Sequence, residues 1–331
     1  MKPNATLKKI SEMLNISIST VSRALKNHPD ISESTKQKVQ ELAQILEYEP
    51  NTYAISLRTN NSKLFGVILP SISNFFYHSF IAALEEEART HGYSLLILQS
   101  GDEAIIEQEN IKLCKANRIA GLFVSITPQT NEIDAFKKIE EQGIPVIFFD
   151  KVPAYEACNK VCVADIASAE LAANALIMKK KKNILAFFGN VQMSISSKRL
   201  EGFTNVFKQQ APTTILNIEY AHSPEAAQLI TKQYFSKKTF PDAVFCMSDE
   251  ILTGVMKSLQ QKNITIPKQT AVVAISNGFI PTLYHPEISF VETSGAKLAK
   301  LSFSRMMSCL AGSTFMQELT LDAVFVKGAS I

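Results

Sequence analysis

Hydrophobic residues at the start of the chain recur every three or four positions, a spacing that is typical of short amphipathic helices. In the first such stretch Leu7, Ile10 and Leu14 share one helix face. Thr6 is a suitable N-cap, and Asn15 tolerates the left-handed conformation that closes many helices. The pattern therefore predicts a helix over residues 7–14.

A second helix is predicted directly after the first. Ser17 caps it, while Val21, Ala24 and Leu25 face inward. The outward residues are Ile18, Ser19, Ser22, Arg23 and Lys26. Two short helices joined by a tight turn form a helix-turn-helix, whose second helix has the size and polar face to enter a DNA major groove. Taken alone, the pattern fits an ordinary helical hairpin with a solvated polar face equally well.

A third helix is predicted after the cap residue Ser32, and it completes a three-helix core. Its apolar stripe consists of Val39, Leu42, Ala43 and Leu46. Pro50 is expected to end this helix, because proline restricts the residue before it. The stretch 52–58 that follows is too short to be a stable helix alone.

From Leu64 onward, short β-rich runs alternate with amphipathic segments. The predicted strands are Leu64–Leu69, Ser94–Leu98, Gly121–Ile126, Val146–Phe149, Ile184–Phe188, Ile215–Tyr220, Ala243–Met247 and Ala271–Ile275, and the helical segments include Ser79–His91, Ala167–Lys179 and Ile251–Gln261. Such alternation predicts parallel sheets covered by helices on both faces. Eight strands are too many for one small sheet, so two α/β lobes are expected.

Composition and charge fit a DNA-binding protein with a separate globular core. The 331 residues are 46% hydrophobic and 20% charged, which is enough apolar material for two or three domains. Residues 1–63 hold nine basic and six acidic residues, whereas the rest holds 25 of each. All the excess positive charge therefore lies in the helical segment, where phosphate contacts would be needed.

Nothing in the sequence indicates a membrane protein, a metalloprotein or an enzyme. There is no run of 18 apolar residues and no apolar signal-peptide core at the start, so a cytoplasmic protein is expected. The five cysteines have no Cys-x-x-Cys pair, the five histidines show no metal-ligand spacing, and there is no phosphate-binding glycine motif. Ser294 and Lys297 have the spacing of a Ser-Lys nucleophile, but they are better explained as a helix cap. We therefore expect no catalytic residues, metal or cofactor.

The stretch from Thr6 to Arg58 closely resembles the DNA-binding headpiece of the lactose repressor (LacI/GalR) family. The matching motifs are the STVSRAL core, the ISE-T-K-V segment, Y-x-PN and the A-x-x-L-R hinge. The resemblance implies a sequence-specific regulator of transcription, a repressor, that binds a palindromic double-stranded DNA operator as a homodimer. It also implies a headpiece over 1–48 and a hinge helix with its linker over 49–61.

The same resemblance implies roles for individual headpiece residues. Ile18, Ser19 and Arg23 would face bases, and a guanidinium can bind guanine O6 and N7 with two hydrogen bonds. Leu57 would be an apolar wedge in the minor groove, with Arg58 beside it. The full set placed on DNA is Thr6, Leu7, Ser17, Ile18, Ser19, Thr20, Arg23, Asn27, Thr35, Tyr48, Asn51, Ala54, Leu57 and Arg58.

The resemblance continues through residues 62–331, as a periplasmic-binding-protein-like core for an effector and for dimerisation. Its matching segments are SISNFFYHSF, VIFFDK, RLEGF and LDAVFVKGAS. In such cores the chain crosses between lobes, here near Val163, Glu292 and Asp322. The expected N-lobe is then about 62–162 plus 293–322, and the expected C-lobe about 163–292 plus 323–331.

Small molecules bind doubly wound folds at the carboxyl ends of the strands, here between the lobes. The residues expected in this effector site are Asn74, Phe76, Tyr77, Asp150, Lys151, Arg199, His222, Asp249 and Ser276. Most sugar-responsive relatives have an aspartate where this chain has Ser276. A sugar or sugar derivative is expected, with a phosphorylated sugar, an oligosaccharide fragment or a nucleobase left open.

Two other functions are weighed against a ligand-controlled regulator. The core could sense a protein partner or nothing at all, and Ser276 is the one hint in that direction. A transported-solute binding protein would need a signal sequence and would have no use for a headpiece.

Overall fold

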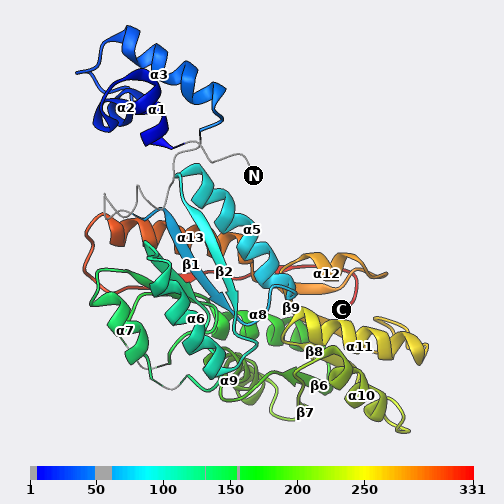
Figure 1. Cartoon of the computed structure of the whole chain (residues 1–331). Helices are drawn as coiled ribbons and strands as arrows, with labels where there is room; N and C mark the ends of the chain where they lie inside the picture. The colour runs from blue at the N-terminus through cyan, green and yellow to red at the C-terminus, as the bar shows by residue number, and fades with distance from the viewer. Residues whose placement is uncertain (1–5, 49–61, 131, 155–156) are drawn as a thin grey trace. The chain divides into compact units, whose positions relative to one another are not determined.

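The computed structural model describes residues 6–48, 62–130, 132–154 and 157–331, and the chain divides into two compact units, Met1–Ser62 and Lys63–Ile331. The first unit contains α1 (Leu7–Leu14), α2 (Ile18–Leu25) and α3 (Glu33–Ile45) (Figure 1). Thr6, Ser17 and Ser32 cap these helices, accepting backbone N–H groups at 3.2, 3.0 and 3.3 Å. Asn15 closes α1 with a φ of 51°. The predicted starts of all three helices are confirmed.

The small core of this unit comes from one face of each helix. Ile10, Val21, Ala24, Val39 and Ala43 are buried together.

The third helix does not end where the sequence analysis placed its end. It stops at Ile45, and Glu47 follows in the left-handed conformation with a φ of 49°. The prediction that Pro50 ends the helix is therefore wrong, because the backbone turns away before the proline.

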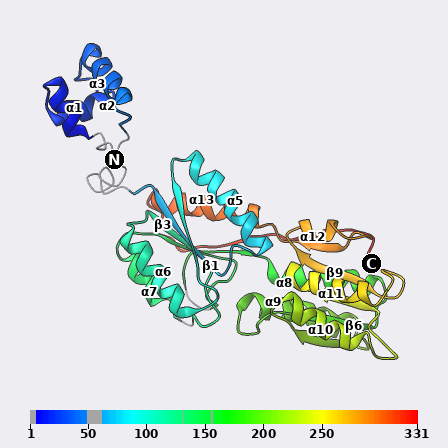
Figure 2. The ribbon, with the colours of Figure 1, turned by 45° about the vertical axis from the view of Figure 1, so that its right-hand side comes forward.

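The second unit has two lobes, each built on a six-stranded sheet (Figure 2). The N-lobe sheet has the order β11-β5-β4-β3-β1-β2, and all its pairings are parallel. Its strands are β1 (Leu64–Leu69), β2 (Ser94–Gln99), β3 (Gly121–Val124), β4 (Val146–Phe149), β5 (Lys160–Val163) and β11 (Glu318–Leu321). Its helices are α5 (Phe75–Thr90), α6 (Ala104–Ala116), α7 (Asp134–Glu140) and α13 (Gly295–Leu310).

The C-lobe repeats this plan. Its sheet has the order β12-β10-β9-β8-β6-β7, and only the β10–β12 pair is antiparallel. Its strands are β6 (Asn183–Phe188), β7 (Ile215–Tyr220), β8 (Ala243–Cys246), β9 (Ala271–Ser276), β10 (Ser289–Glu292) and β12 (Val324–Val326). Its helices are α8 (Asp165–Met178), α9 (Ser194–Gln210), α10 (Pro224–Tyr234), α11 (Asp249–Gln261) and α12 (Phe279–Thr282).

Both faces of the N-lobe sheet are covered, as the unbroken apolar strands predict. Phe65, Val67 and Leu69 of β1 pack toward α5 and α13, whereas Ile68 packs toward α6 and α7. Successive side chains of a strand point to opposite faces, so one apolar strand supplies two cores. The expected arrangement of two doubly wound lobes is confirmed.

All eight predicted strands are present, but four short ones were missed. These are β5, β10, β11 and β12, which have three or four residues each. Helix α5 also begins at Phe75 rather than Ser79, because the Asn74 side chain accepts the N–H groups of Phe76 and Tyr77.

The chain passes from one sheet to the other three times. It leaves the N-lobe sheet after Val163, returns after Glu292, and leaves again between Leu321 and Val324. The three passages lie together. Val163 at the first passage pairs with Leu321 at the third, and Glu292 at the second pairs with Val324 at the third. Within the described ranges, no helix is long and apolar enough to cross a membrane.

The close approach of α10 and α11 in the C-lobe gives a test of this packing. A Cβ atom on Gly254 would lie 2.0 Å from the Pro224 carbonyl oxygen and 3.0 Å from the Ala227 Cβ. We expect Gly254→Ala to lower the free energy of unfolding by about 1–3 kcal/mol, because one helix must move. Chemical denaturation measures this change. Lys257→Ala, an exposed site on the same helix, is the control and should change stability little; equal losses would contradict the packing.

Candidate functional site

A cavity of about 510 Å³ lies where the carboxyl ends of the strands of both lobes meet. This volume is typical of small-molecule sites. All nine residues expected in the effector site line it: Asn74, Phe76, Tyr77, Asp150, Lys151, Arg199, His222, Asp249 and Ser276. The structure therefore brings together residues that are up to 202 positions apart, and their role in binding stays a prediction.

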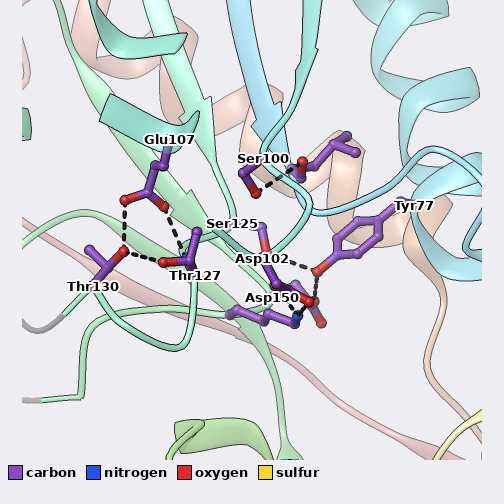
Figure 3. A network of polar contacts seen from close by, with 10 residues as sticks. Tyr77, Ser100, Asp102, Glu107, Ser125, Thr127, Thr130 and Asp150 are labelled. Carbon is purple, nitrogen blue, oxygen red and sulfur yellow. Dashed lines mark hydrogen bonds and ion pairs between the residues drawn. The ribbon is translucent and has the colours of Figure 1, made fainter. Parts of the chain in front are cut away.

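On the N-lobe side, Asp150 is held by Tyr77 (Figure 3). The Tyr77 hydroxyl, on α5, donates to Asp150 Oδ2 at 2.5 Å and lies 2.8 Å from Ser125 Oγ. Loss of solvation raises the pKa of Asp150, which the hydrogen bond from Tyr77 partly opposes. Burial, with Asp150 beside it, raises the pKa of Tyr77 well above its usual range. The phenol therefore stays protonated and serves as a fixed donor.

The neighbouring cation, Lys151, is already paired. Its Nζ donates to both oxygens of Asp102 at 2.8 and 3.2 Å (Figure 3). Asp102 follows β2 and also lines the cavity. This carboxylate was missed by the sequence analysis, although it follows the carboxyl end of a predicted strand.

A buried carboxylate shapes the wall beside this pair. Glu107 on α6 is fully buried; it accepts the Thr127 N–H at 3.0 Å and the Thr130 hydroxyl at 2.7 Å (Figure 3). Burial raises its pKa, which these two donors partly oppose. Glu107 thereby fixes the turn that carries Pro128 and Gln129 into the cavity wall.

On the C-lobe side, Arg199 is the central cation. It is 5% exposed; its Nε donates to Asp165 Oδ1 at 2.8 Å and its guanidinium also donates to the Met247 carbonyl at 2.7 Å. Burial raises the pKa of Asp165 to about 6, although Arg199 opposes this change. Burial also raises the pKa values of Asp150 and Asp249, and Arg199 opposes this rise with a smaller effect than the hydrogen bonds from Tyr77 and Ser276.

Ser276 has a carboxylate beside it. Its hydroxyl donates to Asp249 Oδ1 at 2.5 Å, and the Asn277 N–H donates to Asp249 Oδ2 at 3.0 Å. Burial raises the pKa of Asp249 to about 6, opposed by these donors. A carboxylate at the start of α11 therefore lies next to Ser276 at the end of β9.

Direct hydrogen bonds join the two lobes around the cavity. The Asn74 side-chain amide donates to Glu250 Oε1 at 2.7 Å, and the Ser79 hydroxyl donates to Asn277 Oδ1 at 3.1 Å. Asn277 Oδ1 also accepts the Gly295 N–H at 3.0 Å. Neither Glu250 nor Asn277 was predicted; each directly follows a predicted site residue, and that adjacency was the one available signal.

In the first unit, α2 presents its predicted reading face to solvent. Ile18, Ser19 and Arg23 are exposed, with Ile18 at 48%. The Ser17 hydroxyl lies 2.7 Å from the Ser19 hydroxyl and 2.8 Å from the Thr20 hydroxyl. A small polar surface with one free guanidinium is therefore available to a DNA groove.

The other predicted DNA contacts divide into three groups. Thr6 and Asn27 are exposed, and Thr35 is half-buried against the Ser32 hydroxyl at 2.9 Å. Leu7 and Tyr48 pack on the helical core, and burial raises the pKa of Tyr48. The last group lies outside the described residues: Asn51, Ala54, Leu57 and Arg58.

The part of the chain that the structure describes contains no group of three or more histidine, cysteine, aspartate or glutamate residues arranged to hold a metal ion. The cavity chemistry described above consists of hydrogen-bonding groups and ion pairs.

Comparisons with known proteins agree with both units. Residues 65–291 match the periplasmic binding protein domain, and residues 6–51 match the bacterial regulatory proteins of the lacI family. The sucrose operon repressor of Pediococcus pentosaceus is 26% identical over 332 residues, covering 99% of each chain.

Two solved structures share the fold. The lac repressor dimer bound to operator and an anti-inducer has a TM-score of 0.88 at 20% identity, covering 98% of each chain. A regulator from Enterococcus faecium with bound ribose has a TM-score of 0.73 at 19% identity, covering 81% of this chain and 98% of that one. The chain therefore belongs to the lacI family of bacterial regulatory proteins, with a periplasmic binding protein domain as its core.

Proposed function

We propose that the protein is a transcriptional repressor that binds a palindromic operator as a homodimer and responds to a small molecule in the cavity between its lobes. The observation that carries this proposal is the combination of an exposed α2 face with a polar cavity in the same chain. We infer that it acts in the cytoplasm, where its DNA is, and that it performs no catalysis, as its relatives are named repressors.

The charges of the cavity favour an uncharged, hydroxyl-rich effector. Among the described residues that line it, the carboxylates are Asp102, Asp150, Asp249 and Glu250, and both cations, Lys151 and Arg199, are engaged by carboxylates. A phosphate group would therefore meet excess negative charge and no unpaired cation. Hydroxyl donors suit the carboxylate oxygens, and the half-buried Phe76 in the cavity wall could contact the apolar face of a sugar ring. We therefore propose a neutral sugar or short oligosaccharide rather than a phosphorylated sugar.

The bonds between the lobes offer a route from effector to DNA. An effector that competes for Glu250 or Asn277 changes the hydrogen bonds that hold the lobes together. Because a ligand shifts a conformational equilibrium only by its differential affinity for the two states, these bonds set the size of the response.

Exposed apolar residues on the core support the homodimer. Ile72, Phe75 and Ile97 lie on the N-lobe and Phe279 and Leu283 on the C-lobe, with exposures from 38% to 61%. The two groups are adjacent, since the Asn277 side chain donates to the Phe75 carbonyl, and α12 lies beside the start of α5 in both views (Figures 1 and 2). A patch that spans both lobes would let a change in their angle alter the dimer.

The headpiece assignment is tested at Arg23. If its guanidinium reads guanine, Arg23→Ala should cost about 1–3 kcal/mol on a duplex selected from a random library and little on unselected DNA. Fluorescence anisotropy with the full chain measures both affinities. Lys38→Ala, at an exposed site on α3, is the control. An equal loss on both duplexes would reduce Arg23 to a phosphate contact.

The effector class is tested by thermal unfolding of the full chain with neutral sugars, their phosphate esters and nucleobases. A ligand at one hundred times its dissociation constant should stabilise the core by roughly 2.7 kcal/mol. We expect this from a neutral sugar and not from its phosphate ester. Asp150→Asn should remove the shift, whereas Asp134→Asn, outside the cavity, should keep it.

Stabilisation by a phosphate ester or a nucleobase would contradict a neutral sugar. No shift with any compound would favour the alternative function, a DNA-binding regulator whose core senses a protein partner or no ligand.

The dimer surface is tested by sedimentation velocity. Ile97→Asp and Leu283→Asp should each raise the dimer dissociation constant about tenfold or more, because a charge would be buried at the interface. Ile215→Asp, at a residue that is 61% exposed on the edge strand β7, is the matched control and should leave the dimer intact. Dimers unaffected by both patch variants would place the interface elsewhere.

A further inference from the structure

A cluster of lysines lies at the opposite end of the C-lobe from the cavity. Strands β6, β7, β8 and β9 begin at this edge of the sheet, and helices α8, α9, α10 and α11 end there. We call the surface the lysine face; it consists of Lys179, Lys180, Lys181, Lys182, Lys208, Lys232, Lys237, Lys238, Lys262 and Lys268. Eight of the ten are exposed, and Lys181 and Lys262 are half-exposed.

Hydrogen bonds across the edge confirm that these segments adjoin. The Ile215 N–H donates to the Lys182 carbonyl at 2.8 Å, and Asp242 N–H donates to the Asn183 carbonyl at 2.8 Å. Lys262 Nζ donates to the Ser236 hydroxyl at 2.8 Å, which places the end of α11 beside the end of α10. The lobe with α10, α11 and β6 is shown in Figure 2. The lysines therefore form one surface rather than four separate sites.

Helix dipoles alone do not account for this charge. The last turns of these four helices and their connections to the next strands hold ten lysines and one carboxylate, Asp242. The corresponding segments after α5, α6 and α7 of the N-lobe hold five basic and three acidic residues. Both sets have the same helix polarity, so the C-lobe excess exceeds what capping a helix C-terminus requires.

The charges of the lysine face are not neutralised within the C-lobe. In the continuous described stretch 157–331, the cations of the ion pairs are Lys198, Arg199, Lys297 and Lys300, and none of them is one of these ten lysines. Asp242 is occupied by the backbone N–H groups of Lys182 and Asn183. Lys237 stands over the Tyr234 ring at 4.2 Å. The surface therefore presents a positive field to whatever approaches it.

We propose that the lysine face binds the phosphate backbone of a DNA duplex, without sequence preference, as a contact separate from the headpiece. The proposal rests on the proposed function, because a DNA-binding regulator acts among long stretches of duplex that carry no operator. The face holds lysines and no arginine, and lysine is a point charge that attracts phosphates but lacks the two-pronged geometry that reads bases. Charges spread over four helix ends suit a long, regularly charged polymer.

The test measures how the affinity of the full chain for a random duplex of about 20 bp depends on salt. Each phosphate contact contributes about 0.9 to the slope of log K against log salt concentration. The variant carries K182Q, K208Q and K238Q, three exposed lysines from three helix ends. We expect the slope to fall by about 2 to 3 and the affinity at 50 mM salt to fall about tenfold or more.

The control removes the same charge from the N-lobe through K112Q, K115Q and K138Q, and should leave the slope unchanged. Circular dichroism confirms that both variants fold. A slope that is unchanged in the lysine-face variant, or that falls equally in the control, overturns the proposal.

Weaker binding of the selected duplex by Arg23→Gln, together with an unchanged slope in the lysine-face variant, would retain the headpiece and discard the lysine face alone. A chain that binds no duplex at all would overturn both proposals.

Discussion

The core depends most on the contacts that the Arg199 guanidinium makes. It joins α9 to Asp165, which opens α8 just after the first passage between the lobes, and to the carbonyl at the end of β8. Removing one partner of a buried ion pair typically costs about 3–5 kcal/mol, because the other charge stays buried. Without Arg199, the buried Asp165 carboxylate would lose its ion-pair partner.

The equal numbers of charges in residues 64–331 conceal a strong separation. Carboxylates gather at the carboxyl ends of the strands, where the cavity lies, and lysines gather at the opposite end of the C-lobe. The net charge of the sequence shows only the excess of basic residues in residues 1–63. Position within the fold, which sets the local field, distinguishes a cavity lined by carboxylates from an exposed surface of lysines.

The sequence predicted those features whose causes are local. Thr6, Ser17 and Ser32 cap helices by accepting the backbone N–H three residues further on. The longer strands are recognised by their unbroken apolar runs. Glu318–Leu321 and Val324–Val326 have exposed residues at alternate positions and therefore lack the unbroken apolar run that identified buried strands of four residues such as Val146–Phe149. The prediction that Pro50 ends α3 was wrong because the helix ends earlier, at Ile45, and Glu47 then takes a left-handed conformation.

The cavity shows the same division. Residues that directly follow strands, such as Asp150, were found because parallel strands present their carboxyl ends at one edge. The pair Asn74 and Glu250 is 176 positions apart, and Ser276 meets Asp249 across 27. The first pair depends on how the two lobes face one another, and the second on the pairing of β8 with β9 in one sheet, which spacing along the sequence does not encode.

The three passages between the sheets lie side by side, because Val163 pairs with Leu321 and Glu292 with Val324. Three adjacent covalent links oppose twisting and sliding, and leave bending about a line through them as the easy motion. The three passages would then act as a hinge that both lobes share. A rotation about that line would displace the far ends of both lobes more than the residues at the cavity.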